Sequence, residues 1–178
     1  MGAGNGHKLS VIWDNIYNRG ISMNVLFTAF GTTASELLLQ EVRWQGLVLP
    51  NNKRKDEELL KQEISSGKYS LIISFGQKPN ILDKVYIETT ARNAGDTLET
   101  AFDYEGLAGA FLESQIEVRI SHNAGTSFCN HLYWSGLEYI RENHLDVKMV
   151  FVHIPMQKNI SDFKKFCEGI RTAVEKII

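Results

Sequence analysis

The 178-residue sequence predicts an α/β domain whose mainly parallel sheet is covered by helices on both faces. Three runs of residues, 25–30, 69–75 and 147–154, are almost continuously apolar, which is typical of strands buried on both sides. Segments with apolar residues at helical spacing separate these runs. With 43% apolar residues, the chain is long enough for one well-buried domain.

The elements follow in order from residue 24. The first predicted strand, 25–30, ends at Gly31, and a Thr/Ser cap leads into a helix around residues 36–39. A second strand, 42–49, is stopped by Pro50, and an amphipathic helix spans residues 56–65. The strand 69–75 is the most apolar, and residues 85–90 form a further extended run.

The second half of the chain continues the alternation. A helix is predicted at residues 107–113, a strand at 116–121, and a helix that contains Cys129 and runs to about residue 142. The last strand, 147–154, is closed by Pro155, and the last helix covers residues 161–178. Cys167 lies on the apolar stripe of that helix, so we predict that it belongs to the core.

Residues 1–22 are glycine-rich and weakly patterned, and Met23 could itself be a start codon. The GAGNG at the front follows no predicted strand, so it does not satisfy the context of a nucleotide-binding loop. We expect residues 1–22 to be a leader or an expression remnant and residues 23–178 to form a single domain.

The charge and cysteine content exclude several classes of protein. A net charge of −2, from 19 basic and 21 acidic residues, argues against nucleic-acid binding, and no apolar run has the length of a membrane span. Two cysteines and no signal-like apolar segment predict free thiols in a cytoplasmic protein.

The segment SHNAGTSFCNHLYW places Cys129 just after a turn at the start of a helix. Gly125 allows the tight turn, and Thr126 or Ser127 is a suitable N-cap. In a first helical turn, free N–H groups and the helix dipole favour the thiolate, so we predict a Cys129 pKa below about 8.5. The same N–H groups can bind an oxyanion. The alternative is that Cys129 is a small core residue.

A nucleophilic cysteine needs a base, and His153 is the candidate we favour. It ends a buried strand, where an unpartnered polar side chain is costly, and Ile154-Pro155 then turns the chain outward. On the helix, His131 lies about 200° from Cys129, so the two side chains point apart. The remaining histidines lie in the leader, in the turn before the helix and beyond its far end: His7, His122 and His144.

Glu88 is the candidate to orient the base, because it has the most apolar sequence neighbourhood of any acidic residue. Alternatively, it shares an outward-facing strand surface with Tyr86. A zinc site built from Cys129, His131 and His122 lacks a second Cys/His pair at ligand spacing, so we predict no metal.

Three segments together resemble the pyroglutamyl peptidase I family, the pyrrolidone-carboxylate cysteine peptidases. SHNAGTSFCNHLYW is similar to the family's nucleophile segment, YIETTARN to its glutamate segment and VFVHIP to its histidine segment, in matching order. The resemblance, to a shortened member, implies a triad of Glu88, Cys129 and His153 on a three-layer α/β/α sandwich with a mainly parallel, mixed sheet. It also implies a peptide or small amide substrate, no cofactor and a possible homo-oligomer.

Two further segments resemble the family's substrate pocket. VLFTAFG and SFGQ suggest that Phe30 gives the pyroglutamyl ring an apolar face and that Gln77 both donates to it and accepts from it. The family's second phenylalanine is missing from the short loop after Gly31, which predicts an open pocket and weak activity. A family segment that carries an arginine near the oxyanion is largely absent between residues 93 and 100, and Arg92 is out of register.

These observations favour a cysteine peptidase that removes an N-terminal pyroglutamyl group. One alternative keeps the triad but acts on another small amide or cyclic substrate. The other is a non-catalytic homologue that binds a peptide end, although a pure binding protein has no use for an activated thiol.

Overall fold

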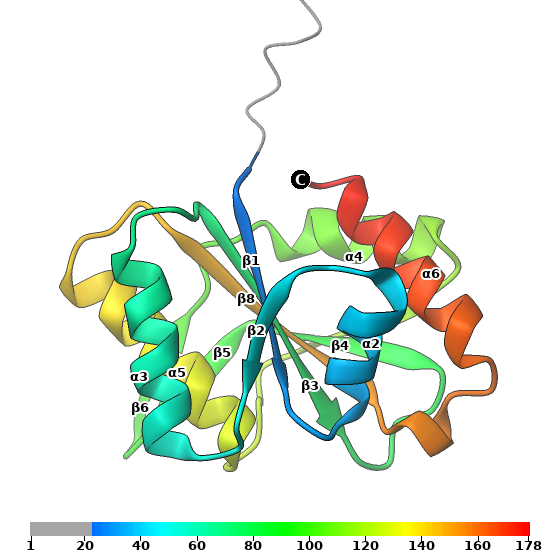
Figure 1. The fold of residues 1–178 in the computed structure, drawn as a ribbon, viewed down its shortest axis with the longest axis horizontal. Coiled ribbons are helices and arrows are strands. Elements are labelled where there is room, and N and C mark those ends of the chain that lie inside the picture. Colours follow the sequence, from blue (N-terminus) through cyan, green and yellow to red (C-terminus); the bar gives the residue numbers. More distant parts are fainter. Residues whose placement is uncertain (1–22) are drawn as a thin grey trace, which may run out of the picture.

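The structure is a computed structural model that describes residues 23–178, and the predicted leader lies outside this range. A six-stranded sheet lies between two layers of helices, with α3 and α5 on one side and α2, α4 and α6 on the other (Figure 1). The predicted three-layer α/β/α fold is therefore confirmed. No helix within residues 23–178 is both long and apolar enough to cross a membrane.

The strands and helices alternate as the sequence predicts, with a few additions. The strands are β1 (Val25–Phe30), β2 (Gly46–Leu49), β3 (Leu71–Lys78), β4 (Lys84–Glu88), β5 (Thr90–Asn93), β6 (Asp96–Glu99), β7 (Glu117–Ser121) and β8 (Lys148–Pro155). The helices are α2 (Ala34–Val42), α3 (Lys53–Ser65), α4 (Tyr104–Glu113), α5 (Phe128–Glu142) and α6 (Phe163–Glu175), with a short 3₁₀ turn at Gln157–Asn159.

The sheet has the order β2-β1-β3-β8-β4-β7 and is mixed. Strands β2, β1, β3 and β8 are parallel, whereas β4 runs antiparallel to β8 and parallel to β7. Successive residues of a strand point to opposite faces, so each central strand supplies two cores. On β8, for example, Val150 and Val152 pack on the α2 and α6 side, while Met149 and Phe151 pack on the α3 and α5 side.

The alternation along each strand determines which polar side chains can meet beneath α5. Because Met149 and Phe151 face α5, His153 faces it too. Val85 and Ile87 belong to the opposite core, so Glu88 also faces α5, and its exposed fraction is 0%. The interpretation of Glu88 as an outward-facing residue is therefore wrong.

Two stretches differ from the sequence prediction. Residues 42–49 do not form one strand, because α2 continues to Val42 and ends at Arg43, which has a left-handed φ of 58°. The extended run at residues 85–90 is interrupted at Thr89, after which β5 and β6 form a separate antiparallel hairpin. This hairpin packs on α5 and was not predicted, since residues 93–99 carry few apolar side chains.

Candidate active site

Cys129 is the second residue of α5, as predicted. The preceding loop turns at Gly125, whose φ of +88° lies in the region that glycine adopts without strain. Ser127 occupies the N-cap position, but its hydroxyl makes no capping hydrogen bond. The first backbone bond of the helix comes from the N–H of His131 to the carbonyl of Ser127, 3.1 Å away. The N–H groups of the first turn, including that of Cys129, thus have no backbone acceptor within the helix.

The sheet brings the thiol next to the strand pair β3 and β8. Gly76 on β3 is in register with His153 on β8. A β-carbon placed on Gly76 would lie only 2.7 Å from the Cys129 Sγ, so the sulfur atom rests directly against this glycine. Cys129 Sγ therefore lies against Gly76, the residue of β3 that is in register with the candidate base His153 on β8.

Glu88 and His153 form a buried hydrogen bond, with 2.8 Å between His153 Nδ1 and Glu88 Oε1. The exposed fraction of the His153 residue is 3%. Lys78 Nζ donates to the same Glu88 oxygen over 2.9 Å and to the backbone carbonyl of Asn123 over 3.2 Å. Lys78 thus connects the carboxylate with the loop that precedes Cys129.

The protonation states follow from burial and from these contacts. Burial by itself would raise the pKa of Glu88, but the hydrogen bonds from His153 and Lys78 hold it below its usual value. Burial lowers the pKa of His153 and outweighs the opposing effect of Glu88. Near pH 7 an ionised Glu88 therefore accepts from the Nδ1–H of a neutral His153, and Nε2 keeps a lone pair that can take a proton.

The prediction of a Cys129 pKa below about 8.5 is wrong. Burial raises the pKa of this thiol to about 12, and the negative charge of Glu88 acts in the same direction. Its own backbone N–H and the charge of Lys78 oppose the change but do not compensate for the lost solvation. The resting thiol is neutral, so a reaction at Cys129 requires a base to remove its proton during attack.

One cavity of about 520 Å³ is lined by the predicted nucleophile, base and substrate-binding residues together: Cys129, His153, Phe30 and Gln77. Gln77 Oε1 accepts the N–H of Ala34 at the start of α2 over 3.1 Å. This bond orients the amide and leaves Nε2 as the group free for a ligand, so donation is favoured over the predicted dual role.

Phe128 also lines this cavity, with 37% of its surface exposed. The sequence analysis looked for a second aromatic side chain in the loop after Gly31 and found none there. The structure instead supplies one from the first turn of α5, adjacent in sequence to Cys129. The prediction of a pocket with a single aromatic wall is therefore corrected.

The other candidate residues have separate partners. His131 Nε2 lies 3.1 Å from Glu57 Oε2 on α3, and His122 Nδ1 lies 2.6 Å from the hydroxyl of Thr89. Cys167 has an exposed fraction of 0% and belongs to the core, as predicted. No group of three or more metal-ligating side chains occurs within residues 23–178.

Sequence reasoning missed residues that hold the site together. Besides Lys78, these are two residues on the buried side of α5. The Asn130 side chain accepts from the N–H of Arg92 over 2.9 Å and donates to its carbonyl over 2.8 Å. The Tyr133 hydroxyl donates to the backbone carbonyl of Glu88 over 2.9 Å. Tyr133 lies four residues after Cys129, at helical spacing, and this was the available signal.

The fold and site define an α/β protein with a cysteine at a helix N-terminus beside a hydrogen-bonded histidine and carboxylate. This arrangement is used by cysteine hydrolases.

Comparison with known proteins gives similar curated sequences, although no family model matches the chain. The chain is similar to pyrrolidone-carboxylate peptidases of Thermoanaerobacter sp. (strain X514), with 29% identity over 116 residues, and of Alkaliphilus oremlandii, with 25% over 168 residues. These matches cover 53% and 75% of this chain and 57% and 78% of the relatives. The chain thus spans little more than half the length of the first of these relatives.

Solved structures of the same group share the fold. The pyrrolidone carboxyl peptidase of Fervidobacterium islandicum AW-1 matches with a TM-score of 0.76 and 17% identity, covering 87% of this chain and 98% of that one. The pyroglutamyl peptidase I of Bacillus amyloliquefaciens matches with a TM-score of 0.72 and 19% identity, covering 85% and 93%. The resemblance to the pyrrolidone-carboxylate peptidase family is confirmed, and the 178-residue chain is consistent with a shortened member.

Proposed function

We propose that this protein is a cysteine peptidase that removes an N-terminal pyroglutamyl residue from peptides. The observation that carries the proposal is the buried hydrogen bond from Glu88 to His153, because His153 lines the same cavity as Cys129. The names of the relatives and of the structural neighbours support the same substrate group.

In the proposed reaction, His153 Nε2 takes the proton of the Cys129 thiol as the sulfur attacks the carbonyl of the pyroglutamyl residue. A general base is required because burial keeps the thiol neutral. Backbone N–H groups in the first turn of α5 stabilise the oxyanion. The imidazolium then gives its proton to the departing amine, water releases the acyl group, and Glu88 keeps the ring oriented throughout.

The ring-binding part of the cavity suits a small, neutral, flat group. Phe30 and Phe128 supply apolar surface, and Gln77 Nε2 is oriented to donate to the lactam carbonyl. A loss of one such neutral hydrogen bond costs on the order of 1–3 kcal/mol in transition-state stabilisation, or roughly 10- to 100-fold in kcat/KM. Gln77 therefore affects which substrate binds, whereas cleavage of the bond depends on Cys129 and His153.

The test is the release of a fluorogenic amine from pyroglutamyl, prolyl and glutaminyl conjugates, with and without prior iodoacetamide. We expect hydrolysis of the pyroglutamyl conjugate alone, abolished by alkylation. Gln77→Ala should lower kcat/KM by roughly 10- to 100-fold, whereas Gln40→Ala, on the exposed side of α2, should not change it.

Phe30 is buried, so Phe30→Leu is the informative change, because it keeps the core filled while removing the flat face. We expect a higher KM with an intact fold. Faster hydrolysis of another small amide, with no effect of Gln77→Ala on the pyroglutamyl conjugate, would assign the site to a different amidase substrate. Absence of any hydrolysis would leave only the binding role.

A further inference from the structure

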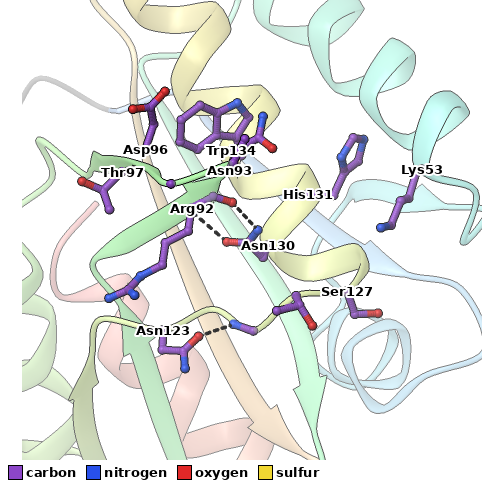
Figure 2. A pocket seen from close by; sticks show the side chains of 14 residues that line it. Lys53, Arg92, Asn93, Asp96, Thr97, Asn123, Ser127, Asn130, His131 and Trp134 are labelled. Atoms are coloured by element: carbon purple, nitrogen blue, oxygen red, sulfur yellow. Dashed lines mark hydrogen bonds between the residues drawn. The ribbon is translucent and has the colours of Figure 1, made fainter.

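A second cavity, of about 570 Å³, adjoins the candidate active site at the start of α5 (Figure 2). Gly125 and Ser127 line both cavities, so only the loop before α5 separates them. Most of the side chains around the second cavity are polar or charged. The proposed reaction does not use it.

Two cationic side chains border this cavity from different elements. Arg92 extends from β5 on one side of the first turn of α5, and Lys53 extends from α3 on the other side (Figure 2). Neither side chain is within ion-pair distance of a carboxylate in residues 23–178. One acidic side chain, Asp96, also lines the cavity and offsets part of this charge.

The position of Arg92 is fixed by the fold. Its backbone N–H and carbonyl both form hydrogen bonds with the side chain of Asn130, whose exposed fraction is 9%. The guanidinium extends away from this anchor toward Asn123 (Figure 2). Lys53 is the first residue of α3, and its Nζ lies 6.0 Å from the centre of the Phe128 ring. Phe128 in turn lines the catalytic cavity.

The loop that contains Gly125 and Ser127 lies between the two cavities. With the pyroglutamyl ring at Phe30 and Gln77, a leaving group directed across this loop would enter the second cavity. In that binding mode the residue after the scissile bond, which extends the chain by about 3.5 Å, is the first to approach Arg92 and Lys53. Free cations there favour a negative charge on that residue.

We propose that the second cavity binds a carboxylate on the residue that follows the pyroglutamyl group, through Arg92 and Lys53. This inference rests on the proposed function and specifies its substrates as pyroglutamyl peptides with an acidic or C-terminal second residue. The carboxylate comes either from an acidic side chain or from the free α-carboxyl group of a dipeptide. Both present the same planar anion, which a guanidinium can bind through two hydrogen bonds.

The experiment measures binding without turnover, by isothermal titration of the Cys129→Ala protein with four peptides. The neutral reference is pyroglutamyl-glutamine amide. Pyroglutamyl-glutamate amide carries only the side-chain carboxylate, pyroglutamyl-glutamine only the α-carboxylate, and pyroglutamyl-glutamate both. We expect at least one singly charged peptide to bind roughly three- to tenfold more tightly than the neutral one, and which one it is identifies the source.

Arg92→Gln and Lys53→Gln should each reduce this preference, and the double substitution should remove it. Addition of 0.5 M NaCl should weaken the preference in part. Lys55→Gln is the matched control, because Lys55 lies in the same first turn of α3 but does not line the cavity. Equal affinity for all four peptides, no binding of any, or a preference that survives the double substitution would overturn the inference. Hydrolysis of neutral conjugates by the wild type tests the proposed function separately.

Discussion

Gly76 provides a sharp steric test of the site. It lies in β3 opposite His153, and its φ is outside the left-handed region, so alanine can adopt its backbone conformation. An added β-carbon would lie 2.7 Å from the Cys129 Sγ and 2.8 Å from the Phe151 ring. Contacts below about 3 Å between such atoms cannot persist, so the neighbours must move.

Phe151 is fully buried and cannot yield easily, so the sulfur atom of Cys129 is the group most free to shift. We expect Gly76→Ala to lower the free energy of unfolding by about 1–3 kcal/mol, the usual cost of one extra methyl group in a packed core. Because a displacement of about 1 Å at a reacting atom can cost on the order of 100-fold, kcat/KM should fall much further than stability alone explains.

Chemical denaturation measures the first effect and hydrolysis of a pyroglutamyl conjugate the second. Gly109→Ala is the matched control, since nothing lies within 4 Å of a β-carbon there and Gly109 is in the middle of α4. That substitution should stabilise the protein by about 0.5–1 kcal/mol and leave activity unchanged. A Gly76→Ala protein as stable and as active as the wild type would refute the placement of Cys129 against β3.

Three further outcomes follow from the electrostatics of the site and from the accessibility of its thiol. The acidic limb of the kcat/KM profile should have its midpoint below about 6.5, because the base must be neutral and burial lowers the pKa of His153; a midpoint at or above 6.5 contradicts this. Lys78→Met should move that midpoint upward, because the positive charge of Lys78 helps to lower the His153 pKa. Lys84→Met, at the other end of β4 from Glu88, should not. Brief iodoacetamide treatment near pH 7 should label Cys129 before Cys167, because Cys129 borders the candidate catalytic cavity whereas Cys167 is fully buried. Equal labelling in a mass spectrum would argue against an accessible nucleophile.

The sequence was sufficient to predict the layers, because each central strand is a run of apolar residues closed by glycine or proline. It was also sufficient to nominate Glu88 and His153, since a polar residue at the end of such a strand needs a buried partner. The structure then joins the two, which lie on adjacent antiparallel strands, by a hydrogen bond. Strand order and direction, however, depend on long-range pairing, which no local pattern reports.

Features that depend on several distant segments were not predictable. The pKa of Cys129 was misjudged because a helix N-terminus is visible in sequence, whereas the burial that opposes it is not. Lys78 gave no sign of its contact with Glu88, because its strand continues beyond the apolar run that marked it. Similarly, the β5–β6 hairpin has little apolar signal of its own and is positioned by its contacts with α5.

The most direct test of the central claim is the activity of triad variants on a fluorogenic pyroglutamyl conjugate. Cys129→Ala and His153→Ala should each lower kcat on the order of 100-fold or more, Glu88→Gln should lower it with the fold intact, and Cys167→Ser should retain it. Because nucleophile and base act as one unit, the double variant of Cys129 and His153 should be no slower than Cys129→Ala alone. An active Cys129→Ala protein, or losses that multiply in the double variant, would contradict the account.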